Sequence, residues 1–336
     1  MDTITHIVLG ATLGEALAGK RLGKKAMLLG AVAQNLPDID IIASCWMDTA
    51  HDVEAHRGIT HSFLFVLVMA PLLARMARNR WPSVSMSFSR WVIFFGLQLF
   101  THIFLDAFNT YGTGWFEPFS HYRVSFNALF VADPFYTVWL LISSVALLVI
   151  KRNSPFRKYW VMAGLTISSF YLYYCLLNKY KVDKWAAEAL QREHIPYDRY
   201  FTTPAPLNNW VWYIVAADSA GYHTGYLSVF DRNKNEDFHF FPRNDSLLAL
   251  FRQRSDVQAL MRFSSGYYTI GRRNDTLLFN VLRFGQMHGW EDGNAGFVFH
   301  YFLQSPENNN VVLQRGRAAE WNRESFLALV RRIKGR

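Results

Sequence analysis

The sequence has little cysteine, little charge and no recognisable export leader. Its 336 residues include two cysteines, Cys45 and Cys175, and no CxxC pair, so a disulfide framework and a thiolate zinc site are excluded. The N-terminus has no charged n-region and no small-residue cleavage site, and we therefore expect no removable signal peptide. Only 18% of the residues are charged, whereas 51% are hydrophobic. This imbalance is typical of a chain with membrane-embedded segments.

The hydrophobic residues are concentrated in the first half of the chain. We expect apolar helices at residues 3–18, 26–36, 63–76, 91–108, 135–150 and 159–177. The first two would be about 24 and 16 Å long, shorter than the roughly 30 Å hydrocarbon core, so they are either short tilted spans or a hairpin partly sunk into the bilayer. We expect the third to break or kink near Pro71. The pattern predicts a mainly α membrane-embedded helical bundle, with about four long spans and two short N-terminal helices.

Basic residues gather in alternate loops of this half. The loops near residues 20–25, 75–90 and 151–158 each hold four Lys or Arg and no acid. The positive-inside rule predicts that these loops are cytoplasmic and the acidic loops are outside. This topology accounts for the net charge of +9, so we expect no nucleic-acid partner. We predict a multi-pass protein of the bacterial cytoplasmic (inner) membrane, surrounded by the lipid bilayer.

The second half has the composition of a soluble domain. We assign residues 1–178 to the membrane-embedded domain, 179–208 to a juxtamembrane helix and linker, and 209–336 to a small soluble α+β domain outside the membrane. Residues 41–54 are expected to form a polar loop. Alternating apolar residues predict strands from residue 210 onward. Further expected elements are strands at 237–241, 267–270, 276–282 and 296–303, a turn at 272–275, and helices at 247–263 and 320–333.

Two ionisable residues lie inside the apolar segment 91–108. His102 and Asp106 are four residues apart, so on a helix they share one face, and Gln98 and Asn109 extend this polar stripe. Ionisable groups at membrane depth are costly unless they pair or bind a cation. The pair is therefore either an intrahelical ion pair or one side of a functional site.

Other candidates occur in segments predicted to reach the same side of the membrane. Imidazole and carboxylate without thiolate form the ligand set of catalytic zinc and similar divalent ions. Zinc is the expected ion, and one or two ions sharing a carboxylate would fit the number of groups. Asp38 or Asp40 would also assist as the general base. The predicted metal ligands are His6, Asp38, Asp40, His56, His61, His102 and Asp106.

Each candidate also has a structural explanation when it is taken alone. His6 near a helix start would be a capping or interface residue, and Pro37-Asp38-Ile39-Asp40 would be a helix stop with a turn. His56 and His61 are five residues apart, so they converge only if His56 lies in a loop and His61 on the following helix.

Arg57 has two interpretations, which stay open. It is either the residue that binds a substrate phosphate or a partner of Asp52 or Glu54 in a salt bridge. We expect His51 and His121 to be solvated in outer loops. The remaining histidines are expected to be surface or packing residues: His194, His223, His239, His288 and His300.

Four motifs together resemble a known family. THIVLG at 5–10, LPDID at 36–40, HRGITHS at 56–62 and HIFLD at 102–106 are similar to the motif set of the YdjM-type family of membrane-bound, metal-dependent hydrolases. The resemblance covers about residues 1 to 180, and HRGITHS is its most specific element. It implies a ligand set with Asp106 as a bridge between ions: His6, Asp38 or Asp40, His61, His102 and Asp106. The family is grouped distantly with zinc-dependent phospholipases C and single-strand nucleases, but this chain has no clear equivalent of the third-metal histidine cluster of the secreted phospholipases.

Two functions remain as hypotheses. The first is a membrane-bound metal-dependent hydrolase of phosphoester bonds, acting on a lipid or lipid-linked substrate whose phosphate is held by Arg57. The second is a non-catalytic integral membrane protein with a structural or metal-handling His/Asp site. A catalytic zinc site keeps an open coordination position, whereas a structural site is closed by four protein ligands.

Overall fold

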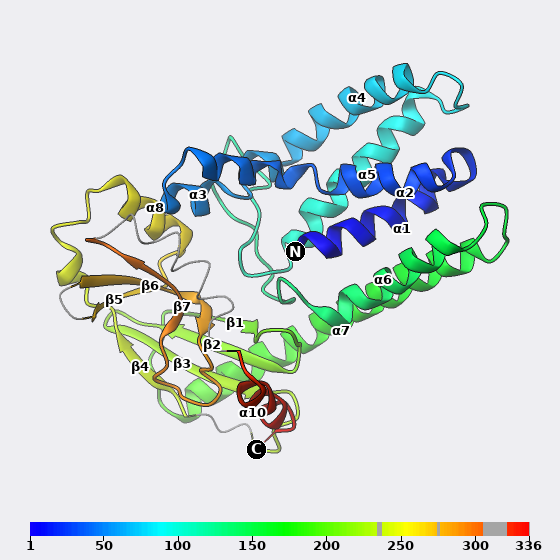
Figure 1. Cartoon of the computed structure of the whole chain (residues 1–336). Helices are drawn as coiled ribbons and strands as arrows, with labels where there is room; N and C mark the ends of the chain where they lie inside the picture. The colour runs from blue at the N-terminus through cyan, green and yellow to red at the C-terminus, as the bar shows by residue number, and fades with distance from the viewer. Residues whose placement is uncertain (234–236, 274–275, 305–320, 336) are drawn as a thin grey trace. The chain divides into compact units, whose positions relative to one another are not determined.

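The computed structural model describes residues 1–233, 237–273, 276–304 and 321–335 (Figure 1). These residues form two compact units. Unit 1 consists of Met1–Ile42, His56–Leu176 and Pro206–Asn208, and unit 2 of Ala43–Ala55, Leu177–Ala205 and Asn209–Arg336. The chain is helical in its first part and continues into a small β-sheet domain.

The apolar runs of unit 1 form helices close to their predicted positions. One prediction is wrong: the expected juxtamembrane helix is not separate, because α7 is one helix of 36 residues that passes from unit 1 into unit 2. α4 is not broken at Pro71, which lies inside the helix. The helices are α1 (Thr3–Leu22), α2 (Lys24–Gln34), η1 (Pro37–Cys45), η2 (Ile59–His61), α4 (Phe63–Arg80), α5 (Phe88–Asp106), α6 (Pro134–Val149) and α7 (Arg157–Arg192).

Glycines allow α1 and α2 to pack at very short distance. A Cβ added to Gly14 would lie 2.2 Å from the carbonyl oxygen of Ala26, and one added to Gly10 would lie 2.5 Å from that of Gly30. Small residues at such positions let two helix backbones approach closely within a membrane. α1 also packs against α5 and α6, and α5 packs against α2 and α4. The close α1–α2 pair therefore supports the helix that carries His102 and Asp106.

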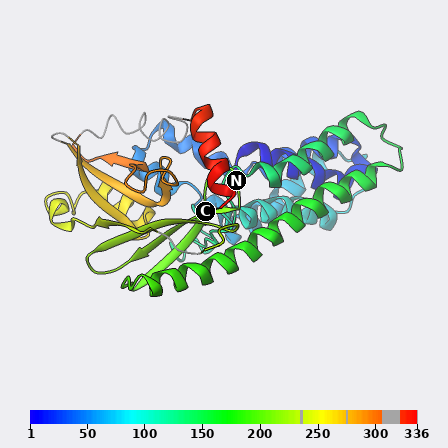
Figure 2. The same cartoon turned by 90° about the horizontal axis from the view of Figure 1, so that it is seen from below.

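α6 and α7 lie side by side as an antiparallel pair (Figure 2). The hydroxyl of Ser143 donates to the carbonyl of Trp160, and that of Ser168 donates to the carbonyl of Tyr136. The position on α6 falls from 143 to 136 while the position on α7 rises from 160 to 168. This opposite order is the one that antiparallel packing requires.

The three basic turns lie together at one end of unit 1 (Figures 1 and 2). Arg152, between α6 and α7, donates to the carbonyls of Lys20 and Arg21 at the end of α1. α5 begins at the basic turn that follows α4 and ends at Asp106, about 27 Å further along its axis. The histidine and carboxylate of α5 are therefore at the end of unit 1 opposite to the basic turns.

Among the described residues, two helices are long and apolar enough to cross a membrane, namely α5 and α7. Two pairs of helices separated by a bend, Lys24–Gln34 with Pro37–Cys45 and Thr49–His61 with Phe63–Arg80, raise the number to four if each pair is one span. α6 is apolar but shorter.

Unit 2 contains two antiparallel sheets within its described residues. The first has the order β1 (Arg199–Pro204), β2 (Val211–Ala217), β3 (Gly221–Ser228) and β4 (His239–Pro242), and the second the order β5 (Tyr268–Arg273), β6 (Thr276–Gln286) and β7 (Phe297–Phe302). The helices are α3 (Thr49–Ala55), η3 (Asp245–Leu248), α8 (Ser255–Phe263) and α10 (Arg323–Ile333).

One hydrophobic core joins the two sheets and α10. It contains Tyr213 and Tyr226 from the first sheet, Leu282 and Phe297 from the second sheet, and Leu329 from α10. All seven residues of β2 are buried, because the strand is covered on both faces. The α+β interpretation of this part of the chain agrees with these elements.

Three expectations for unit 2 were wrong. Residues 199–204 lie in the predicted linker but form β1, where the terminal Pro204 is tolerated because β1 is an edge strand. The expected helix 247–263 is divided into η3 and α8. The expected loop 41–54 includes part of η1 and most of α3, and α3 packs against α8 with Glu54 paired to Arg262. Parts of the predicted turn 272–275 and of the helix 320–333 (residues 274–275 and 320) lie outside the described residues.

Candidate metal centre

The site is built on the last turns of α5. His102 and Asp106 lie four residues apart on this helix, and neither side chain is exposed to solvent (0% each). His102 Nε2 is 3.8 Å from Asp106 Oδ2, so the pair faces a common point instead of forming a close hydrogen bond.

His61 approaches this point from a segment that is fixed on both sides. It is the last residue of η2, and Ser62 caps α4 by accepting a hydrogen bond from the backbone N–H of Phe65. The N–H of Phe63 donates to the carbonyl of Trp115, whose indole N–H donates to the carbonyl of Ile103 on α5. These bonds attach the His61 segment to the helix that carries His102.

Asp38 arrives from the other side, where α2 ends. Pro37 begins the short helix η1, and Asp38 lies in its first turn. Its side chain is 23% exposed, whereas those of His61, His102 and Asp106 are fully buried. Asp38 is therefore the member of the group that reaches the surface.

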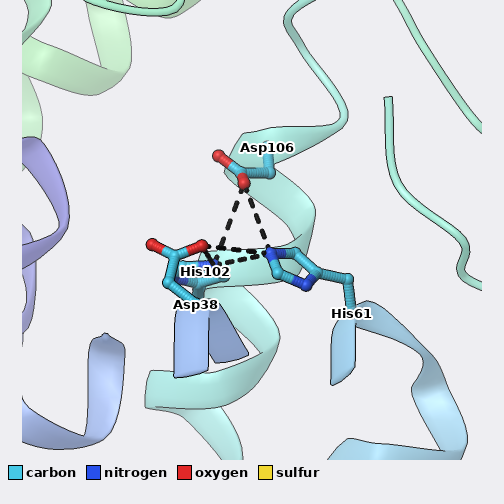
Figure 3. Close-up of side chains that lie close together, drawn as sticks. All are labelled: Asp38, His61, His102 and Asp106. Carbon is cyan, nitrogen blue, oxygen red and sulfur yellow. Dashed lines mark hydrogen bonds and ion pairs between the residues drawn. The ribbon is translucent and has the colours of Figure 1, made fainter. Parts of the chain in front are cut away.

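Four side chains point toward one another (Figure 3). His61 Nε2 and His102 Nε2 are 3.1 Å apart. Asp38 Oδ1 is 3.4 Å from the first nitrogen and 3.5 Å from the second, and Asp106 Oδ2 is 3.6 Å from His61 Nε2. Asp38, His61, His102 and Asp106 offer ligand atoms that all lie within 4.8 Å of one another.

These separations suit a tetrahedral ion. Zinc bonds to nitrogen and oxygen of about 2.0–2.1 Å place adjacent tetrahedral ligands about 3.3 Å apart. The five separations given above for this group, between 3.1 and 3.8 Å, surround that value. Within the described residues, Asp106 Oδ2 also accepts no hydrogen bond although it is buried. The donor set is therefore one that could hold a divalent metal ion.

His6 lies beside this group but is not one of its four members. Its ring stacks on that of His102 with centroids 3.8 Å apart, and its Nε2 is 3.1 Å from Oδ1 of Asp106, the other carboxylate oxygen. The amino group of Met1 contacts the same oxygen. Asp106 thus faces the four-atom group with one oxygen and His6 with the other.

Asp40 and His56 form a second group with Asp38. Ligand atoms of these three residues also lie within 4.8 Å of one another, and His56 Nδ1 is 2.9 Å from Asp40 Oδ1. The other oxygen of Asp40 accepts hydrogen bonds from the Arg57 N–H (2.8 Å) and the Thr60 hydroxyl (2.9 Å).

Asp40 also lies near the ring of His61. Its Oδ2 is 3.6 Å from His61 Nδ1, the nitrogen opposite to the one that faces His102. The Thr60 hydroxyl is 3.0 Å from the same Nδ1. Such contacts to the second nitrogen of a histidine fix its ring orientation for metal binding. Sequence reasoning missed Thr60, although it lies inside the HRGITHS motif.

Arg57 is buried beside Asp106. Its side chain is 4% exposed, its Nε lies 3.1 Å from Asp106 Oδ2, and its Nη1 donates to Asn109 Oδ1. The backbone of Arg57 is in the left-handed region with φ of 63°, which is strained for a residue with a side chain. Arg57 supplies positive charge to a buried carboxylate in this structure, whereas Glu54, one of its two expected partners, pairs with Arg262.

Neither of the two histidines expected in solvated loops is a member of these groups of ligand atoms. His51 contacts Asp48, and His121 contacts Glu117 with a side chain that is 81% exposed. His121 is solvated as expected, whereas His51 lies on helix α3 instead of a loop and is 33% exposed.

The first 182 residues match the family model of the YdjM inner membrane protein. The chain belongs to the YdjM inner membrane protein family. The matched region contains all seven candidate ligands. It also contains the helices from α1 to α6 and the first part of α7. Most of unit 2 lies beyond it.

Two curated proteins are similar to this YdjM-family chain. The uncharacterized protein YfhP of Bacillus subtilis is 28% identical over 182 residues, which is 51% of this chain and 51% of that protein. The inner membrane protein YbcI of Escherichia coli is 27% identical over 164 residues, which is 48% of this chain and 87% of YbcI. The chain thus spans about half the length of YfhP. No solved structure matches it.

Proposed function

We propose that this protein is a metal-dependent hydrolase of phosphoester bonds in the bacterial inner membrane, with a lipid or lipid-linked substrate. The observation that carries the proposal is the convergence of Asp38, His61, His102 and Asp106 at distances that suit a divalent ion. Zinc is the expected ion because two imidazoles and two carboxylates, without thiolate, are a common ligand set for it.

The proposed topology is multi-pass. α5, α7 and the two bent helix pairs would cross the bilayer, with α6 as a shorter segment. The basic turns would face the cytoplasm by the positive-inside rule. Because α5 runs from a basic turn to Asp106, the site would then open near the outer leaflet. A site at that depth favours an amphiphilic substrate over a soluble polymer.

The residues around the ion have separate proposed roles. His61, His102 and Asp106 would hold a divalent ion with a fourth coordination position left open for water, which the ion would make more acidic as a Lewis acid. Asp38 is the exposed member, so its carboxylate would meet the substrate and accept a proton as general base. Asp40 would share this role or hold His61 and the preceding residues Arg57 and Thr60 in place. Arg57 would bind the phosphate by exchanging its contact with Asp106 for one with the substrate.

Two of the three candidate ligands outside the four-atom group fit a second ion together with Asp38. Asp38, Asp40 and His56 would hold it on the exposed side. His6 would instead share Asp106 through Oδ1. Two ions would stabilise both the attacking and the leaving oxygen of the phosphoester.

A structural metal site is the second candidate, and one observation favours it. The main group offers four protein ligand atoms, and four protein ligands close a tetrahedral zinc site. The chain would then be a non-catalytic membrane protein with a structural or metal-handling site.

One experiment separates the two functions. The wild-type protein, purified in detergent with its bound metal, is assayed with bis(p-nitrophenyl) phosphate and with phosphatidylglycerol and phosphatidylethanolamine vesicles. A hydrolase loses activity with EDTA, recovers it with zinc, and loses it in Asp38→Asn but not in the exposed-loop control His121→Ala. A structural site gives metal-bound protein without hydrolysis, whose thermal stability falls when EDTA removes the ion.

A further inference from the structure

A basic hollow lies at the end of unit 1 opposite to the candidate metal centre. It has a volume of about 930 Å³ and is formed by the last turn of α4, the turn that follows and the first turn of α5. This volume is within the range of ligand sites. Its polar lining residues are all exposed, namely Arg78, Asn79, Ser85, Ser87 and Arg90.

The turn that borders the hollow is fixed by packing and by backbone hydrogen bonds. The ring of Trp81 stacks on that of Trp91 with centroids 6.1 Å apart, and Met86 is buried in the core that α4 and α5 share. The N–H of Trp81 donates to the carbonyl of Ala77 at 2.9 Å, and that of Val84 donates to the carbonyl of Trp81 at 3.1 Å. The lining side chains are therefore carried by a backbone of defined shape.

The hollow has positive charge without a compensating acid. Two of its lining residues are arginines, Arg78 and Arg90, and none is acidic. The sequence contains no Asp or Glu between Glu54 and Asp106. Exposed guanidinium groups bind phosphate well, because each presents N–H donors that match two oxygens. The ammonium group of a zwitterionic ligand finds no carboxylate there, so the hollow favours a phosphate with net negative charge.

The start of α5 adds neutral donors to the two arginines. The oxygen of the Ser87 hydroxyl accepts the N–H of Arg90 at 3.3 Å, so the hydroxyl proton is left for another acceptor. The exposed hydroxyl of Ser85 also belongs to the lining. The first N–H groups of a helix have no partner inside the helix and favour an anion.

Apolar side chains lie next to the polar lining. α5 and the bent pair that includes α4 are the candidate spans that meet at this hollow. The exposed Ile93 follows Arg90 by three residues, and the exposed Met76 precedes Asn79 by three, so each shares a helix side with a lining residue. A phosphate site bordered by exposed apolar surface matches the two parts of a phospholipid, which a soluble anion lacks.

We propose that this hollow binds the headgroup of an anionic phospholipid, with the acyl chains along α4 and α5. Arg78 and Arg90 hold the phosphate, and Ser85 and Ser87 donate to the remaining oxygens. In the proposed topology this lipid belongs to the cytoplasmic leaflet. Because it binds the folded bundle, it stabilises unit 1, and it is distinct from a substrate bound at the opposite end.

The test uses the full chain purified in dodecyl maltoside. Native mass spectrometry measures the binding of phosphatidylglycerol and of phosphatidylcholine with the same acyl chains. We expect phosphatidylglycerol to bind more tightly, and Arg78→Gln and Arg90→Gln each to weaken it about fivefold. Lys151→Gln removes an exposed charge from another basic turn, and this control should bind phosphatidylglycerol as the wild type does.

Thermal unfolding gives a second measurement. Phosphatidylglycerol should raise the unfolding temperature of the wild type and of Lys151→Gln, but not that of the double variant Arg78→Gln/Arg90→Gln. Both arginines are exposed, so the double variant should unfold at the wild-type temperature when no lipid is added.

Four results would overturn the proposal. Equal affinity for the two lipids would show that the headgroup charge is not recognised. Binding of phosphatidylglycerol that the double variant retains would place the lipid elsewhere. A loss in Lys151→Gln as large as in Arg90→Gln would indicate general attraction to a basic surface. Binding of inorganic phosphate that Arg90→Gln weakens, without preferential binding of phosphatidylglycerol, would make the hollow a site for soluble anions.

Discussion

Nε2 of His61 lies 3.1 Å from Nε2 of His102, although 41 residues separate the two histidines in the chain. Both side chains are fully buried, and Asp38 and Asp106 approach the same nitrogens. Two imidazole nitrogens at this distance either share a proton or face a common cation. The presence of two carboxylates around them favours the cation.

Arg57 should stabilise unit 1 through its contact with Asp106. Arg57→Ala leaves the buried carboxylate without that guanidinium, and breaking a buried ion pair typically costs about 3–5 kcal/mol. We expect a clear fall in the thermal unfolding temperature in detergent with EDTA present. Arg75→Ala, at an exposed position of α4, should change it little.

The double variant Arg57→Ala/Asp106→Asn tests the cause of that loss. Because the carboxylate charge is then removed too, we expect part of the lost stability to return. Additive losses in the double variant would mean that Arg57 acts through other contacts.

The close packing of α1 on α2 predicts different effects at two glycines. Gly14→Ala places a Cβ 2.2 Å from the Ala26 carbonyl oxygen, so the backbones must separate, at a cost of about 1–3 kcal/mol. Gly96→Ala meets only the Cβ of Ala70 at 3.7 Å and should be neutral or stabilising by up to about 1 kcal/mol, because alanine is the better helix former. Thermal unfolding of the two variants gives the comparison, and equal stability would contradict the packing.

In unit 2, α10 should depend on one buried arginine. Arg332 Nη1 donates to Asp231 Oδ1 at 2.7 Å, and the two side chains are 5% and 1% exposed. Arg332→Ala should cost about 3–5 kcal/mol, whereas the exposed neighbour Arg331→Ala should stay within about 0.5 kcal/mol. Limited proteolysis and thermal unfolding of the full chain measure this, and a stable Arg332→Ala variant would show that the pair contributes little.

The side of the membrane is tested by fusion to alkaline phosphatase. The enzyme needs disulfides that form outside the cytoplasm, so a fusion after Arg336 should be active if unit 2 is outside. A fusion after Val84, in the basic turn between α4 and α5, should be inactive. An inactive but well-expressed fusion after Arg336 would reverse the proposed topology.

Much of unit 1 could be predicted from sequence because its signals are local. Apart from the end of α7, the apolar runs gave the helices within a few residues. The four-residue spacing of His102 and Asp106 placed both on one face of α5. The motifs that carry Asp38 and His61 also reach that face. The division of the seven candidates was not predictable, since it depends on which carboxylate oxygen each ring approaches, as the contact of His6 with Asp106 Oδ1 illustrates.

Unit 2 was harder to predict for a different reason. β1 carries Pro204, which normally argues against a strand, and only its position at the edge of the sheet makes it acceptable. The packing of α3 on α8 joins residues 208 positions apart through the Glu54–Arg262 pair. A short polar segment such as 49–55 gives no periodic signal from which such a contact could be read.

The most direct measurement is the metal content of the purified protein by mass spectrometry. Wild type and His121→Ala should each carry at least one divalent ion per chain, with zinc expected. His102→Ala should lose most of it, because one of the four converging ligand atoms is removed while the exposed control histidine is not among them. Wild-type protein without stoichiometric metal, or His102→Ala protein that keeps all of it, would contradict the shared metal site.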